Sequence, residues 1–189
     1  FVGSTKVAKI VYQRATSNLK RCLALGGAKN HLIVLPDAQL EMTATNVVAS
    51  MSGCAGQRCM AAAVMIGVNQ VQPIIDRMCE VARSIKPGEQ LGAIISKEAK
   101  SRIEAYIDEA EKAGAKVLVD GRNAKVPNKE GGFYVGPTIV DYVTPDMRIA
   151  QEEVFGPVIS IIRAKNLNEA IAIENASPYG NAASVFTEN

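Results

Sequence analysis

A cysteine that could act as a nucleophile lies in the segment Gly56-Gln57-Arg58-Cys59, between a predicted helix and a strongly apolar run. The apolar run can hold the thiol rigidly at a cleft. The charge of Arg58 would favour the thiolate, which is the nucleophilic form. The alternative is that Cys59 is a small buried apolar residue, the usual role of cysteine. No histidine lies nearby to form a Cys/His pair, so the local sequence leaves both interpretations open.

Two adjacent acids form a second candidate site. Glu152 and Glu153 lead into Val154-Phe155-Gly156-Pro157 and then into a predicted strand. Adjacent side chains of an extended segment point in opposite directions, so one carboxylate can enter a cleft while the other faces solvent. The alternative is the solvated start of a loop, because glutamate is mostly exposed in proteins.

A third candidate is Gly3-Ser4-Thr5, which opens a predicted helix. Free N–H groups and the helix dipole at such a terminus can bind a phosphate group. A serine that caps the helix without any ligand is the more common arrangement. The basic residues Lys20 and Arg21 alternate with acids further along the chain, which is typical of a solvated face.

The elements that must position these residues follow from apolar periodicity and from Gly and Pro punctuation. Helices are predicted over 6–15, 40–52, from Pro73, 97–113 and 168–175; strands are predicted over 22–25, 31–35, 60–68, 116–119, 135–140, 158–162 and 183–186. Residues 120–132 are polar and predict a surface loop. The alternation with apolar strands predicts a three-layer α/β/α domain with a mostly parallel sheet covered on both faces.

Composition excludes several classes of protein. The 189 residues carry 21 Lys+Arg against 19 Asp+Glu, a net charge of +2, which argues against a nucleic-acid partner. No run of about 18 apolar residues exists, so no membrane partner is expected. The four cysteines lack the close pairing of a metal site or a disulfide framework, and free thiols imply a reducing compartment. The abrupt ends predict the interior of a longer protein.

Several stretches, taken in order, resemble the aldehyde dehydrogenase superfamily. They are Phe1–Thr5, Asn18–Arg21, Leu25–Gly27, Gly56–Cys59, Gly92–Ser96, Gly132–Thr138, Glu152–Pro157 and Ala183–Thr187, and they span essentially the whole chain. Gly27-Ala28-Lys29-Asn30-His31, Pro36-Asp37-Ala38 and Gly56-Gln57-Arg58-Cys59-Met60-Ala61 look like the methylmalonate-semialdehyde dehydrogenase branch. That branch is CoA-acylating and uses NAD.

The resemblance implies a role for several residues. Cys59 would attack the aldehyde carbon to give a thiohemiacetal and then a thioester, and its backbone N–H would help to hold the oxyanion. Ser4 would lie near the cofactor pyrophosphate, and Glu153 would bind the nicotinamide ribose. Phe155 would pack beside the nicotinamide, and the carbonyl of Gly26 would face its carboxamide.

One departure from the superfamily pattern favours the acylating branch. Hydrolytic members carry a glutamate base before a Leu-Gly-Gly-like turn, where this sequence has Leu25, or Ala24 if one gap is allowed. Water needs such a base to attack a thioester, whereas a thiol is partly ionised at neutral pH and is a better nucleophile. We therefore expect CoA to release the acyl group, as propanoyl-CoA or acetyl-CoA with loss of CO2. Arg58 is the candidate ligand for the carboxylate of the semialdehyde substrate.

The resemblance also predicts how the chain is organised. Residues 1–24 would be the end of an NAD-binding domain, and residues 25–189 would be most of a catalytic domain. The full-length protein is expected to be a homotetramer, in the mitochondrial matrix of a eukaryote or the cytoplasm of a bacterium. This chain alone is expected to bind NAD poorly and to show little or no turnover. The alternatives are an aldehyde dehydrogenase of another substrate range and a catalytically inactive fragment.

Overall fold

A six-stranded sheet organises the chain in the computed structural model, which describes residues 1–189. Its strands are β1 (Asn30–Val34), β2 (Ala62–Val68), β3 (Lys116–Val119), β4 (Thr138–Asp141), β5 (Val158–Ala164) and β6 (Ala183–Phe186). The spatial order is β3-β4-β5-β2-β1-β6. Every neighbouring pair is parallel except β3 and β4, which are antiparallel. The prediction of a mostly parallel sheet is confirmed.

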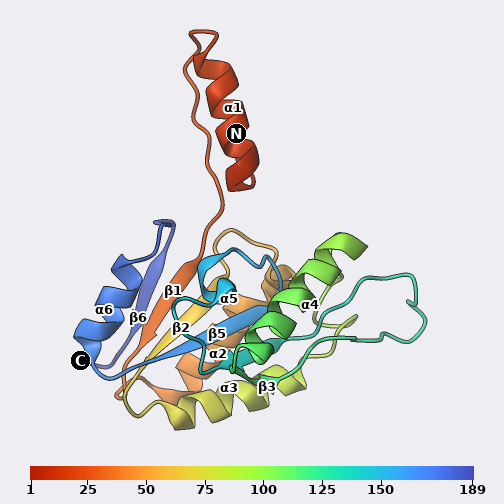
Figure 1. The fold of residues 1–189 in the computed structure, drawn as a ribbon. Coiled ribbons are helices and arrows are strands. Elements are labelled where there is room, and N and C mark those ends of the chain that lie inside the picture. The colour runs from red at the N-terminus through yellow and green to blue at the C-terminus, as the bar shows by residue number, and fades with distance from the viewer.

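Helices α2 (Leu40–Ser52) and α3 (Gln72–Ser84) cover one face of the sheet (Figure 1). Apolar side chains of both helices pack in one buried cluster with alternate residues of the central strands, such as Met65, Ile159 and Ile161. Pro73 lies in the first turn of α3, where its missing N–H costs nothing, as the sequence predicts.

Helices α4 (Lys97–Lys112), α5 (Arg148–Gln151) and α6 (Leu167–Asn175) cover the opposite face. The other alternate residues of the same strands, among them Val64, Ile66 and Ile162, pack against them in a second buried cluster. Because neighbouring residues of β2 and β5 enter different clusters, both faces of the central strands are buried. The three-layer α/β/α architecture is therefore confirmed.

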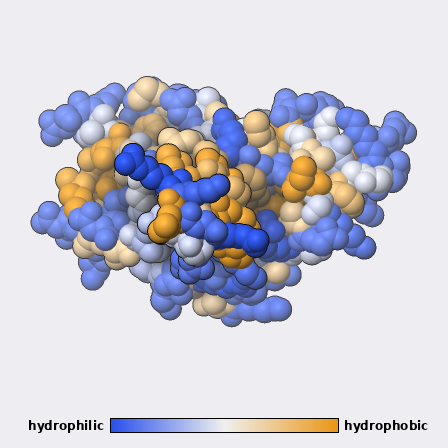
Figure 2. Space-filling model, turned by 90° about the horizontal axis from the view of Figure 1, so that it is seen from above, coloured by the Kyte–Doolittle hydropathy of each residue, from blue (hydrophilic) through white to orange (hydrophobic).

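Helix α1 (Thr5–Thr16) projects from the body, and residues 17–29 return beside it to enter β1 (Figure 1). The prediction of a buried strand over residues 22–25 is wrong. Leu23 and Leu25 are exposed, and the segment forms only one isolated bridge, between Leu25 and Val2. Seen from above, the surface of the molecule shows apolar residues among hydrophilic ones near its centre (Figure 2).

No helix has the length and apolar character needed to cross a membrane.

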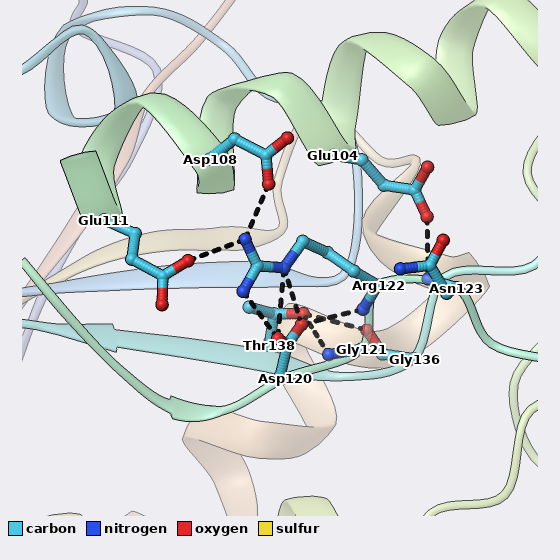
Figure 3. A network of polar contacts seen from close by, with 9 residues as sticks. All are labelled: Glu104, Asp108, Glu111, Asp120, Gly121, Arg122, Asn123, Gly136 and Thr138. Carbon is cyan, nitrogen blue, oxygen red and sulfur yellow. Dashed lines mark hydrogen bonds and ion pairs between the residues drawn. The ribbon is translucent and has the colours of Figure 1, made fainter.

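At the far end of the sheet from β1, a network of charges fixes the start of the predicted surface loop (Figure 3). The Arg122 guanidinium lies 2.6 Å from a carboxylate oxygen of Asp108, 2.8 Å from one of Glu111 and 2.6 Å from one of Asp120. The N–H of Gly121 donates to Thr138 Oγ1 in β4. We call Arg122 and its three carboxylates the Arg122 network, which ties the loop to α4 and to the end of β3.

Candidate active site

Cys59 is exposed at the amino-terminal end of β2, in a turn formed by residues 53–61 that we call the Cys59 turn. The turn begins with a short 3-10 segment, η1 (Gly53–Gly56), in which Cys54, Ala55 and Gly56 all have positive φ. Two consecutive non-glycine residues in this region store strain, which surrounding contacts must hold. The exposed position disagrees with the alternative that Cys59 is a buried apolar residue.

A close backbone contact joins the Cys59 turn to the segment that carries the two glutamates. A Cβ atom on Gly56 would lie 1.9 Å from the carbonyl oxygen of Gly156, so only glycine permits this approach. A small hollow opens beside the contact, at the amino-terminal ends of β1, β2 and β5. Its lining includes Asn30, Arg58, Cys59, Glu153 and Phe155. Four of the residues singled out in the sequence therefore line one hollow.

In the peptide group that joins Arg58 to Cys59, the carbonyl is hydrogen-bonded and the N–H is free. The N–H of Ala61 donates to the carbonyl of Arg58 at 3.1 Å, which closes the turn. The N–H of Cys59 has no hydrogen-bond partner within the protein. A free N–H beside an exposed thiol can stabilise an oxyanion that forms when the thiolate adds to a carbonyl group.

Gln57 holds the outer side of the turn. Its amide donates to the carbonyl of Ala93, and its Oε1 accepts from the N–H of Ile95 at 2.9 Å. Residues 93–95 lead directly into α4, whose N-terminus Ser96 caps. The turn is thus attached to the helical layer as well as to the strand it precedes.

The side chain of Arg58 makes only one hydrogen bond in the structure. Its Nη2 donates to the carbonyl of Ser50 in the last turn of α2 at 2.9 Å. The side chain also lies against Gly53, where an added Cβ would be 2.3 Å from Nη2. Because a guanidinium group has five N–H donors, most of its capacity to bind an anion is unused beside the hollow.

The two glutamates point to different surroundings, as predicted for an extended pair. Glu152 accepts hydrogen bonds from Arg148 and Tyr106, and these lower the pKa of its carboxyl group. Glu153 points the other way, toward Gly27, where an added Cβ would be 2.7 Å from Glu153 Oε2. Burial raises the pKa of Glu153, and the N–H of Ala28 opposes that shift.

The N-terminus of α1 lies beside the same glycine. The hydroxyl of Thr5 accepts from the N–H of Gly27 at 3.0 Å, and the N–H of Gly3 donates to the carbonyl of Leu25. The prediction of a helix starting after Ser4 is confirmed, although the Ser4 side chain makes no capping hydrogen bond. The pairing of residues 1–5 with 23–27 therefore brings the start of α1 to Gly26 and Gly27, and Glu153 lies against Gly27 as well.

A buried lysine lies behind the glutamates. Lys29 is only 4% exposed and has no ion pair within the protein. Burial lowers the pKa of Lys29 to about 7, and the carboxylates of Glu153 and Glu152 oppose the shift. Lys29 supplies a positive field next to Glu153 when it is protonated.

Sequence reasoning missed the residues that support the nucleophile from behind. Asn30 and Asn181 both donate to the backbone carbonyl of Cys59, at 2.7 and 2.8 Å. A polar residue at the start of a buried apolar strand, as Asn30 is, was the available signal. Nothing in the sequence indicates that Asn181, more than a hundred residues away, reaches the same atom.

Comparison with known proteins identifies the class. The model of the aldehyde dehydrogenase family matches residues 1–189, and the chain belongs to that family. The chain is 44% identical to malonate-semialdehyde dehydrogenase of Listeria monocytogenes. It is 41% identical to the human enzyme named methylmalonate-semialdehyde/malonate-semialdehyde dehydrogenase [acylating], mitochondrial. These alignments cover 100% of this chain but only 40% and 36% of the two relatives.

Solved structures agree with the sequence relatives. The crystal structure of methylmalonate-semialdehyde dehydrogenase from Oceanimonas doudoroffii superimposes with a TM-score of 0.96 at 40% identity, covering all of this chain and 40% of that one. Betaine aldehyde dehydrogenase from Staphylococcus aureus, in complex with NAD+, gives a TM-score of 0.94 at 29% identity, with 100% and 39% coverage. The chain thus spans about two fifths of the length of the proteins it matches.

Proposed function

We propose that this chain provides the catalytic cysteine of an NAD-dependent, CoA-acylating semialdehyde dehydrogenase. The substrates would be malonate and methylmalonate semialdehyde, and the products acetyl-CoA and propanoyl-CoA with CO2. The observation that carries the proposal is the hollow in which Cys59, Arg58, Glu153 and Phe155 meet. The names of the human and Listeria relatives agree with this substrate class.

The chemistry of the chain centres on Cys59. Its thiolate would add to the aldehyde carbon, and the free N–H of Cys59 would donate to the oxyanion. Oxidation of this adduct leaves a malonyl or methylmalonyl thioester on Sγ, and loss of CO2 with uptake of one proton would convert it into an acetyl or propanoyl thioester. The turn that carries Cys59 is held on three sides, by Gly156, by the backbone near α4 and by β1, so the thiol keeps its place during the reaction.

Residues near the turn fit the nicotinamide cofactor. The N–H groups in the first turn of α1 have no partner, so they can receive a pyrophosphate group. The absence of a Cβ at Gly27 leaves room for the Glu153 carboxylate, which can accept two hydrogen bonds from ribose hydroxyls. Phe155 would pack beside the nicotinamide, and the carbonyl of Gly26 would face its carboxamide. NAD, when bound, supplies a hydride acceptor.

Release by CoA is supported because no residue that lines the hollow is left to act as the base that hydrolysis needs. Leu25 occupies the position predicted for the hydrolytic base, and it cannot take a proton from water. Glu153 is the only carboxylate that lines the hollow, and we assign it to the ribose. A thiol needs less assistance than water because it ionises near neutral pH. CoA would attack the thioester carbonyl, take the acyl group and return Cys59 Sγ as the leaving thiolate.

Arg58 is proposed as the ligand of the substrate carboxylate. Its side chain has unused N–H donors next to the nucleophile, and a guanidinium group can bind a carboxylate through two parallel hydrogen bonds. The bond to Ser50 holds the side chain in place without using these donors.

Assembly and location complete the proposal. We propose that residues 1–24 belong to a cofactor-binding domain and residues 25–189 to a catalytic domain, in a homotetramer. The human relative is named mitochondrial, which supports the matrix as the location if the source is eukaryotic. For a bacterial source we propose the cytoplasm.

An acyl-transfer assay tests the proposal on the 189-residue chain without NAD. p-Nitrophenyl propanoate would acylate Cys59 with release of p-nitrophenolate, and CoA would then accept the acyl group. We expect a propanoyl adduct on the peptide that contains Cys59, detected by mass spectrometry, and its loss on addition of CoA. Cys54→Ser is the matched control, because Cys54 is also exposed in the same turn. An adduct on Cys54 instead of Cys59 would overturn the assignment.

A further inference from the structure

We propose that Asn181, together with Asn30, is a positioning residue for the Cys59 nucleophile, an inference that rests on the proposed function of Cys59. The two side chains form a double amide clamp on one backbone atom, the carbonyl oxygen of Cys59. Asn30 Nδ2 lies 2.7 Å and Asn181 Nδ2 lies 2.8 Å from that oxygen. A carbonyl oxygen has two lone pairs, so the clamp uses its full accepting capacity.

The clamp is built from distant parts of the chain. Asn30 begins β1, and Asn181 lies in the segment between α6 and β6. The two asparagines are 151 residues apart along the chain. Strand β1 pairs with β6 on one side and β2 on the other, so the sheet brings both amides to the start of β2. The position of the nucleophile therefore depends on the correct pairing of three strands.

Every polar atom of Asn30 is used. Its Nδ2 donates to Cys59 and also to the carbonyl of Ala61 at 2.9 Å, and its Oδ1 accepts from Asn181 Nδ2 at 3.2 Å. Asn30 is 6% exposed, so each of these bonds replaces one that water would otherwise supply. Asn30 orients Asn181, and both then orient Cys59.

The need for the clamp follows from the strain and exposure of the turn. Cys54, Ala55 and Gly56 have positive φ, and residues 58–60 are exposed, so solvent-side packing does not fix the thiol. The carbonyl of Cys59 is the anchor nearest to its side chain. If water replaced the amide donors, the direction of the Cα–Cβ bond would vary, and attack on a carbonyl carbon requires that direction to be maintained.

The test uses Asn181 because the residue is exposed and its replacement leaves the core intact, whereas Asn30 is buried. Asn181→Leu removes both donors at similar size, and Asn181→Asp places an acceptor opposite the Cys59 carbonyl. The readout is the steady-state release of p-nitrophenolate from p-nitrophenyl propanoate by the 189-residue chain, with CoA present as the acyl acceptor. We expect kcat to fall by about 10- to 100-fold with KM almost unchanged, and further in Asn181→Asp than in Asn181→Leu.

A matched control separates positioning from stability. Asn166 also uses its side chain in a hydrogen bond, because its Oδ1 accepts from the N–H of Glu169 at the start of α6, far from the turn in sequence. Asn166→Ala is expected to lower the melting temperature without changing kcat. An unchanged kcat in both Asn181 variants, with Cys59→Ala inactive, would overturn the clamp alone. Full acylation in Cys59→Ala would overturn the proposed function instead.

Discussion

Two arginines, one beside the edge strand β3 and one before the central strand β2, show how the same side chain can serve a structure or a site. Arg122 contacts three carboxylates, and its hydrogen bond to Asp120 is the main cause that raises its pKa above the ordinary value. The side chain of Arg58 makes one hydrogen bond, to a backbone carbonyl, and keeps its remaining donors beside an exposed thiol. A guanidinium group whose N–H donors are mostly hydrogen-bonded fixes a loop, whereas one whose donors are mostly free can bind a ligand.

The same contrast extends to the surroundings. The Arg122 network balances its charge locally, and its residues stabilise the join between α4 and β3. The Cys59 turn contains positive-φ residues and an unbonded N–H, and Lys29 is buried without an ion pair near Glu153. Such features cost stability and are typical of sites where structure is held for chemistry.

The largest effect on activity is expected at Cys59 itself, and it tests the distinction between a catalytic Cys59 turn and a structural Arg122 network. Cys59→Ala removes the nucleophile but no buried contact, because the side chain is exposed. Acylation by p-nitrophenyl propanoate should fall to the background rate, while the midpoint of urea unfolding stays unchanged. A large loss of stability in this variant would mean that the turn is structural like the Arg122 network.

Replacement of Arg58 is expected to have the next largest effect, and only on charged substrates. In the enzyme active with NAD and CoA, Arg58→Leu should reduce kcat/KM for malonate semialdehyde. The reduction should correspond to an increase of about 2–3 kcal/mol in activation free energy, the value of a lost charged hydrogen bond. Arg58→Lys should recover part of it. Propanal, which lacks a carboxylate, serves as the control, and equal losses on both substrates would remove the carboxylate-binding role.

Lys29 should contribute a pH dependence of stability. Its folded-state pKa is lowered by burial to about 7 from an unfolded value of 10.5, so the charged form is disfavoured in the folded protein. This penalty is fully present below pH 7 and disappears as the pH rises toward 10.5. Lys29→Met should therefore be more stable than wild type by about 1–3 kcal/mol at pH 6. Urea unfolding at pH 6 and pH 10 should show the difference shrinking, and a constant difference would contradict the assignment.

The smallest effect is expected in the Arg122 network. Arg122→Met should lower the free energy of unfolding by about 1–2 kcal/mol, because it removes three partly exposed ion pairs and leaves three carboxylates together. The hydrogen bond from Arg122 lowers the pKa of Asp120, so this contribution is present above about pH 4 and is lost as the pH falls further. Acyl transfer by Cys59 should be unaffected, and a parallel loss of activity would contradict a purely structural role of the Arg122 network.

Local patterns predicted much of the fold. The bounds of α2 and β6 agree with the expectation from apolar periodicity and flanking turn residues. The strand expected from residue 60 begins at Ala62 instead, since the turn closed by Arg58 and Ala61 uses the first apolar residues. The apolar segment 22–25 was wrongly predicted as a buried strand, because an apolar run indicates surface to be covered but does not identify its partner.

The site was predictable only in part. Cys59, Arg58, Glu153 and Phe155 were found by residue type and motif, and the structure brings them to one hollow. Asn181 was not, because its role arises from the strand pairing that places the end of the chain beside β1. The short helix α5 was missed as well, since one turn carries too little periodicity to detect.

The central claim is that a thioester on Cys59 is released by a thiol in preference to water. The direct measurement is the decay of propanoyl-Cys59 in the isolated acyl-protein, followed by mass spectrometry of the intact chain with and without CoA. The account predicts that the adduct persists in buffer and disappears on addition of CoA, with propanoyl-CoA formed in equal amount. Decay in buffer alone at the same rate as with CoA would contradict it.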